Sequence, residues 1–285
     1  MAKGNLLLGT AKNSVGDVVM YRREGAQITR VRVRIVKNPK TVAQSFQRAI
    51  MAPIAKFYSP LSDVLERSFE GLSKAKSHNK FNQVNANLAR AKKWALPKGT
   101  GFFPLPYELS QGTLPSLNYY AEGTLTIQTP GLTAENSTIG GLSTSLATLG
   151  LKDGDVVTII VINSHSVGGG VTSYVPITTQ FVVDSTSTKT FAEAFGSAWR
   201  FAVSGGALSI DTVGGGQLKA GAIIAARFDG NMWRRNSQYL AVDAELMSTI
   251  TADAAVTAAI ASYGQSAGDG NPLVYLDGDE LTGGQ

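Results

Sequence analysis

The chain has 285 residues, of which 43% are hydrophobic and 16% charged, a composition that is typical of a folded protein and argues against disorder. It has no cysteine, so neither a disulfide framework nor a thiolate metal site is possible. The net charge of +5 is distributed unevenly along the chain. Residues 1–100 hold 19 Lys and Arg against 5 Asp and Glu, a balance of +14, whereas the remainder has a balance of −9.

The first predicted elements are two strands, residues 17–21 and 27–36, joined by a turn around Glu24-Gly25. In the second strand, apolar residues alternate with arginines, which gives the strand one apolar face and one basic face. We expect the apolar face to be buried beneath the sheet and the basic face to point at a partner. The apolar residues are Val31, Val33 and Ile35, and the basic ones are Arg30, Arg32 and Arg34.

Helices follow these strands. The Asn38-Pro39 pair ends the second strand, because a proline restricts the residue before it and cannot extend the ladder. Thr41 with Gln44 forms a possible capping box at the start of a helix that runs towards Phe57. Pro53 is expected to kink this helix or end it. Apolar spacing predicts two more helices, one after Pro60 and one at about residues 77–94.

From about residue 117, β-branched runs separated by glycine-rich turns predict a different architecture. Several short strands at such spacing favour a mainly antiparallel β-sandwich, either immunoglobulin-like or jelly-roll-like. The predicted fold class is therefore α+β, with a small N-terminal β-sheet and helices followed by the sandwich. The predicted domains are a basic strand-plus-helix module at 1–100, a linker at 101–116, the sandwich at 117–264 and an acidic terminal arm at 265–285.

The inventory for catalysis is poor. The only histidines are His78 and His165, and neither has a sequence neighbour that would build a triad or a metal site. The Asp153-Gly154-Asp155 segment lacks the further ligands of a calcium loop, so we interpret it as a turn that opens a strand. The glycine runs at 168–170 and 214–216 lack the lysine of a phosphate loop. We therefore predict no enzyme activity, no cofactor and no metal site.

The arginine-rich strand carries the main functional prediction. Alternate residues of a strand lie about 6.6 to 6.8 Å apart, a repeat similar to the phosphate spacing of an extended nucleic-acid strand, so this face fits nucleic acid. An acidic protein surface, on another copy or on a different subunit, is the favoured interpretation, and a basic face that is only solvated is a further alternative. A third alternative, carbohydrate binding, is suggested by the aromatic residues Trp199, Trp233, Tyr239 and Tyr263. The candidate partner-binding residues are Arg22, Arg23, Arg30, Arg32, Arg34, Lys37, Lys40 and Arg48.

The opening of the chain resembles an uncharacterised family from Bacteroidota and their phages, a domain of unknown function. The resemblance rests on a short glycine-rich start, a VGxVV strand at residues 15–19, the arginine-rich strand and a KNPxTxxQxxQR motif at residues 37–48. Looser similarity extends to a GDxVxLVVYN-like strand at residues 154–163 and to a closing strand with an S-x-YL pattern at residues 223–240, where RRNSQYLAV ends the pattern. Residues 101–150 and the terminal tail fit the family least.

The resemblance implies a structural role, because members of that family look like products of mobile elements or viruses and lack signal peptides. Together with the charge polarity, it predicts a non-enzymatic structural or assembly protein of a phage-like particle, which self-associates through its basic N-terminal half and its acidic C-terminal half. Its expected partners are other copies of itself or other virion proteins, with nucleic acid as the alternative. The expected location is the virion or the host cytoplasm, because no signal peptide or membrane span is evident.

Overall fold

The structure is a computed structural model that describes residues 2–3, 13–15, 17–23, 26–32, 42–92, 102–166, 172–196, 198–211, 216–243 and Leu246. The chain divides into two compact units, Met1–Val42 and Ala43–Gln285. We call them the N-terminal unit and the body and describe each by itself. No described helix is long and apolar enough to cross a membrane.

The N-terminal unit is a small antiparallel sheet. Its strands are β1 (Ala2–Lys3), β2 (Asn13–Val15), β3 (Val18–Arg23) and β4 (Ala26–Val31), and their order is β1-β4-β3-β2. Both predicted strands therefore form, but the second one ends at Val31. The predicted continuation of this strand to Val36 lies outside the described residues.

The expectation that the apolar face of β4 is buried is wrong at Val31, whose side chain is 73% exposed. Gln27 is the only residue of this unit whose described side chain is buried. The physical reason is that the described residues of the unit form one sheet and no second layer. A sheet buries a face only when another element covers it.

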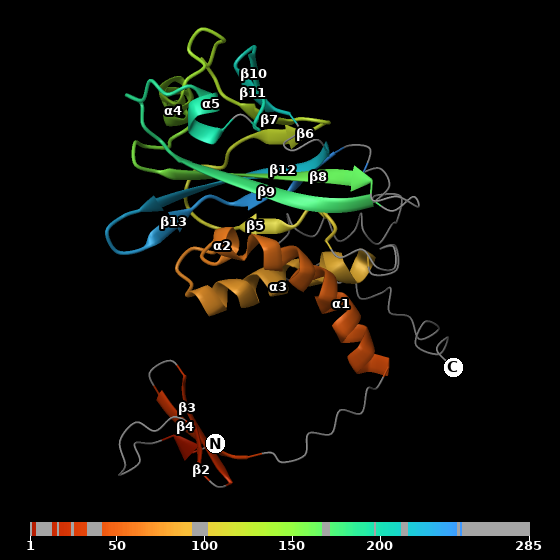
Figure 1. Cartoon of the computed structure of the whole chain (residues 1–285). Helices are drawn as coiled ribbons and strands as arrows, with labels where there is room; N and C mark the ends of the chain where they lie inside the picture. Colours follow the sequence, from red (N-terminus) through yellow and green to blue (C-terminus); the bar gives the residue numbers. More distant parts are fainter. Residues whose placement is uncertain are drawn as a thin grey trace. The chain divides into compact units, whose positions relative to one another are not determined.

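The body consists of three layers (Figure 1). The first is helical and contains α1 (Val42–Tyr58), the short η1 (Ser59–Leu61), α2 (Ser62–Leu65) and α3 (Lys74–Lys92). All three predicted helices are present. Pro53 lies within α1 and does not end it. The short strands β5 (Glu108–Ser110) and β14 (Gln238–Tyr239) pair with each other beside this layer.

The middle layer is a long antiparallel sheet. It contains β8 (Val156–Ser166), β9 (Thr172–Val182), β12 (Gln217–Phe228) and β13 (Trp233–Arg235) in the order β13-β12-β8-β9, with β15 (Ala241–Val242) also paired to β12. Residues 157–163 of β8 are all buried, because layers cover both faces of this sheet. Alternate residues therefore enter two different cores. Ile160 packs on the helical side and Ile159 on the opposite side.

The third layer is a second antiparallel sheet with two helices. Its strands are β6 (Tyr119–Ala121), β7 (Leu125–Gln128), β10 (Phe201–Ser204) and β11 (Ala207–Ile210), in the order β10-β11-β7-β6. The helices are α4 (Ile139–Thr148) and α5 (Phe191–Phe195), and a capping box of Thr190 and Glu193 begins α5. The two facing sheets form a β-sandwich-like part within an α+β fold, as the sequence predicted.

The domain boundaries differ from those predicted. Leu105, Tyr107 and Leu109, within the predicted linker at 101–116, are completely buried in the core shared by the helical layer and the long sheet. Asn85 on α3 also accepts a hydrogen bond from the Glu108 amide and donates one to its carbonyl, at 2.8 and 3.0 Å. The helices and the sandwich therefore belong to one unit. The predicted acidic arm at 265–285 lies outside the described residues.

This division also changes the charge balance of the parts. The N-terminal unit, residues 1–42, has nine basic and two acidic residues, whereas the body sequence has 17 basic and 19 acidic residues. The predicted +14 and −9 sections therefore do not correspond to separate compact parts. The balance becomes +7 for the N-terminal unit and −2 for the body.

Candidate functional sites

The arginines of the N-terminal unit lie on both faces of its sheet. Arg30 is exposed and pairs across the ladder with Val19, whereas exposed Arg22 pairs with Gln27. Because Gln27 and Arg30 are an odd number of residues apart on β4, their side chains point to opposite faces. Arg22 and Arg30 therefore do not share one basic track. The Arg30 guanidinium lies 5.7 Å from the centroid of the Tyr21 ring, a cation–π arrangement.

The other candidate residues of the ladder are only partly described. Arg32 follows β4, is exposed, and its backbone amide donates to the carbonyl of Asp17 at 2.6 Å. Arg23 lies in β3, but its side chain is not described. Arg48 is exposed on α1 and belongs to the body. Arg34, Lys37 and Lys40 lie outside the described residues.

A second candidate site, which the sequence did not predict, is a cleft in the body with a volume of about 540 Å³. One wall is the connection between α2 and α3, and the other is the hairpin between β12 and β13. Its apolar surface includes Phe228 and Trp233, whose ring centroids are 5.3 Å apart. Phe228 is 56% exposed, an unusual position for a large aromatic side chain. We call this site the aromatic cleft.

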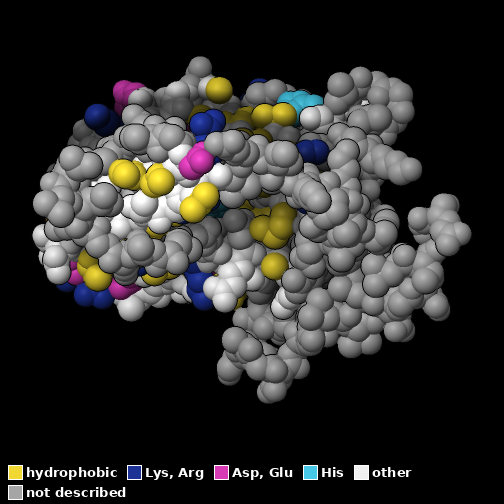
Figure 2. All heavy atoms as spheres, turned by 90° about the horizontal axis from the view of Figure 1, so that it is seen from below, with side chains coloured by type: hydrophobic (Ala, Val, Ile, Leu, Met, Phe, Trp, Pro, Cys, Tyr) yellow, Lys and Arg dark blue, Asp and Glu magenta, His cyan; other side chains and the backbone are white. Residues whose placement is uncertain are grey.

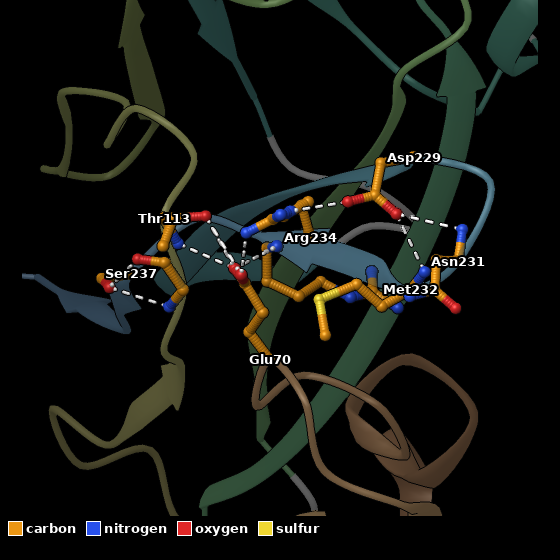
Figure 3. Close-up of polar contacts among 9 residues, drawn as sticks. Glu70, Thr113, Asp229, Asn231, Met232, Arg234 and Ser237 are labelled. Carbon is orange, nitrogen blue, oxygen red and sulfur yellow. Dashed lines mark hydrogen bonds and ion pairs between the residues drawn. The ribbon is translucent and has the colours of Figure 1, made fainter.

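Glu70 joins the two walls of the aromatic cleft (Figure 3). Its carboxylate accepts hydrogen bonds from the Arg234 guanidinium at 2.9 Å and from the Thr113 amide at 2.8 Å. It also accepts one from the Arg235 amide at 3.3 Å. Asp229 holds the hairpin turn, because it accepts from the Met232 amide at 2.9 Å and from Arg234 at 2.9 Å. These bonds fix the hairpin relative to the helical layer.

Gly112 is required at this junction by close packing. A Cβ atom at this position would lie 2.1 Å from the carbonyl oxygen of Arg235 and 2.7 Å from a carboxylate oxygen of Glu70. The Gly112 amide donates to the Ser237 hydroxyl at 3.1 Å. Any larger residue would therefore push the hairpin away from the segment that carries Thr113.

The carboxylates beside the aromatic cleft accept hydrogen bonds, whereas two of the guanidinium groups there form no ion pair with a described carboxylate. Burial alone raises the pKa of Glu70, but the hydrogen bonds from Thr113, Arg235 and Arg234 outweigh burial and hold that pKa below its usual value. Burial lowers the pKa of Arg235, and repulsion from the Arg67 guanidinium lowers it further. Among the described residues, no carboxylate forms an ion pair with the side chain of Arg67 or Arg235.

Lys74 adds another cation to the rim of the aromatic cleft, where it forms an ion pair with Glu66. The Arg235 guanidinium lies 5.6 Å from the centroid of the Trp233 ring. On the face seen in Figure 2, described hydrophobic side chains lie in separate groups with Lys and Arg side chains between them. By its lining residues, the aromatic cleft combines aromatic side chains with Arg67 and Lys74, which suits a ligand that has both apolar and acidic groups.

The residues that we considered for enzyme chemistry occupy structural positions in the helices, strands and turns of the body. His78 lies on α3 against the Tyr58 ring, with ring centroids 4.3 Å apart, and His165 lies near the end of β8. Asp155 belongs to the turn that opens β8, as predicted, and pairs with Arg227 through two bonds of 2.7 Å. Within the described part of the chain, no group of three or more potential ligands could hold a metal ion.

The aromatic residues that suggested carbohydrate binding are not gathered at one site. Trp199 is buried in the core between the two sheets, where its ring stacks on that of Phe201. Trp233 lines the aromatic cleft, and Tyr239 is 39% exposed on β14. Tyr263 lies outside the described residues.

Comparisons with known proteins found no matching family model, no matching curated protein and no matching solved structure. The family resemblance and the functions that it implies therefore stay predictions. The functional argument depends on the geometry of the N-terminal unit and of the aromatic cleft.

Proposed function

We propose that the chain is a non-enzymatic structural or assembly protein of a phage-like particle, which self-associates through its N-terminal unit. The observation that carries this proposal is the side-by-side exposure of Val31, Arg30 and Arg32 at the end of β4. Val31 and Arg30 point to opposite faces of the strand. One face therefore offers an apolar contact that would remove Val31 from water, and the other offers a cation that an acidic partner would neutralise.

The poor burial within the N-terminal unit supports association. Small sheets need a second layer for stability, and the described strands of this unit have none. The described apolar side chains of β3 and β4 are partly or largely exposed. Packing against another copy would supply the missing layer. The balance of +7 would favour an acidic region of the neighbour.

Light scattering tests the self-association. We expect the molar mass to exceed the 30.0 kDa of one chain at low salt and to fall towards that value in high salt. Val31→Ser should shift the equilibrium towards the monomer. The matched control is Val175→Ser on β9, where the valine is 41% exposed. A chain that remains monomeric at every concentration would contradict the proposal.

A genome-binding role is the second candidate, and the exposure of both Arg30 and Arg32 favours it. A labelled single-stranded oligonucleotide should then bind with an affinity that falls steeply with salt, because counterions are released on binding. Arg30→Ser combined with Arg32→Ser should weaken this binding, whereas the exposed pair Lys152→Ser and Lys189→Ser should have little effect. Equal affinities of the wild type and the arginine variant would reject this role.

A further inference from the structure

The aromatic cleft lies in the body and is separate from the N-terminal contact proposed above. It is built in advance of any ligand, because Glu70 in one wall accepts hydrogen bonds from the Arg234 guanidinium and the Arg235 amide of the other. Fixed walls lower the entropic cost of binding, since few side chains must become ordered. The cleft therefore has the properties of a docking site.

The chemistry of the walls selects the ligand. Phe228 offers an aromatic surface that water now covers in part, and burial of this surface on binding is favourable. Arg67 lines the cleft as an exposed cation and forms no ion pair with a described carboxylate. Arg235 does not line the cleft, but it repels Arg67, and its Nε donates to the Arg67 carbonyl at 3.0 Å. An anionic group bound near them would relieve this repulsion. The expected ligand is therefore a segment with apolar residues directly followed by carboxylates.

The chain itself contains such a segment in its C-terminal part. Residues 273–276 have the sequence LVYL, and Asp277, Asp279 and Glu280 follow within four positions. In the 35 residues from 251 to 285 there are five acidic residues and no basic residue. The charge and the apolar pattern of this segment complement the aromatic cleft.

The path of the described chain is compatible with a segment from another copy, and the self-association proposed above supplies that copy. β15 pairs antiparallel with β12 at Ala220 and Gly221, so the chain leaves β15 in the direction away from the hairpin at Phe228. The seven residue-to-residue steps from Gly221 to Phe228 span about 23 Å of strand. The 26 residues at 247–272 extend at most about 90 Å, which is long enough to reach the cleft of the same chain or that of a neighbouring body, and the proposed self-association selects the neighbouring copy.

We propose that the aromatic cleft binds the acidic-apolar segment at residues 273–280 of a second copy. This inference rests on the proposed self-association and names a second contact for it. Each copy would then offer one cleft and one segment, which is a head-to-tail contact that can repeat.

Fluorescence anisotropy with a labelled peptide of residues 271–281 tests the docking. The receptor is the full chain carrying Asp277→Asn, Asp279→Asn and Glu280→Gln, so that its own segment competes less. We expect saturable binding, which about 1 M salt weakens at least several-fold. A peptide with the same three neutral substitutions should bind about tenfold more weakly.

Variants of the cleft identify the binding surface. Phe228→Ala and Arg67→Glu should each weaken peptide binding about tenfold or more, as expected for central contacts of an interface. The matched controls are Tyr120→Ala, a 46% exposed aromatic on β6, and Lys189→Glu, an exposed cation on the body. They should change the affinity less than about twofold. Circular dichroism should confirm that each variant is folded, since all four side chains are at least partly exposed.

Different experimental results would contradict the docking and the proposed function. Absence of peptide binding, or equal weakening by cleft and control variants, overturns the docking even if light scattering still shows self-association. A strict monomer that binds the peptide at the aromatic cleft overturns the assembly role and also the second copy as the source of the segment. Peptide binding that requires Phe228, together with a molar mass that falls in the tail-neutralised chain, supports both.

Discussion

Strands with apolar residues are buried in the body but largely uncovered in the N-terminal unit. β8 in the body is buried along residues 157–163, because helices cover one face of its sheet and a second sheet covers the other. β4 in the N-terminal unit also contains Ile28 and Val31, yet its only buried residue is Gln27. The burial of a strand is therefore decided by the layers around it and not by its own residues.

A cavity in the body should give the largest effect and would sharpen this comparison. Phe57 on α1 is completely buried, and its ring lies 4.4 Å from that of Tyr107 between centroids. Phe57→Ala should lower the free energy of unfolding by about 3 to 5 kcal/mol. Met51→Ala, at a 37% exposed position of the same helix, and Val31→Ala should change it by about 0.5 kcal/mol or less. Urea denaturation followed by tryptophan fluorescence measures these values.

The hydrogen bonds of Asn85 test whether the helical layer and the sandwich are one unit. Asn85→Ala leaves the buried amide and carbonyl of Glu108 without this partner, so we expect a loss of about 1 to 3 kcal/mol. Gln83→Ala, at an exposed position of α3, should have little effect. Unfolding should remain a single transition in both variants. Two separate transitions would break the comparison, because the body would then consist of two independent domains.

Local sequence patterns predicted the elements of the fold well. The predicted strand from residue 27 forms as far as Val31, and the apolar spacing of the helices and the glycine-separated β-branched runs also correspond to real helices and strands. The predicted linker was wrong, because proline and glycine around residue 101 suggested exposure. Tyr107 and Leu109 instead enter a core whose other half is formed by strands far along the chain, such as β8 and β12.

The candidate sites show the same limit. The exposure of Arg30 and Arg32 was predictable from alternation, but their separation from Arg22 depends on the register of β3 and β4. The aromatic cleft was not predicted. The Asp229-Gly230 pair between Phe228 and Trp233 signals its hairpin, since such a pair is a common hairpin turn. Its other wall begins at Arg67, more than 150 residues earlier, and only tertiary packing brings the two together.

The pH dependence of stability should distinguish the hydrogen-bonded Glu70 from an exposed glutamate of the body. The pKa of Glu70 is lowered in the folded state, so its contribution is present above its unfolded pKa of about 4.5 and is lost as the pH falls through the folded value. Glu70→Gln should lower the stability by about 1 kcal/mol at pH 7. The difference from the wild type should shrink below about pH 4. Glu122→Gln, at an exposed glutamate, is the control for urea denaturation at both pH values.

The arginines of the N-terminal unit should give the smallest effect on the body. Arg30 and Arg32 are exposed, and the described contact of the Arg30 side chain is with Tyr21 in the same unit. Arg30→Ser with Arg32→Ser should therefore change the unfolding free energy of the body by about 0.5 kcal/mol or less. The same variant should reduce self-association or oligonucleotide binding. Stability is measured on the body, whereas self-association and oligonucleotide binding are measured on the N-terminal unit. A shift of several degrees in the Tm of the body at low protein concentration would therefore show that the two units are energetically coupled within one chain. Such a shift would break the comparison from which the proposed function is argued.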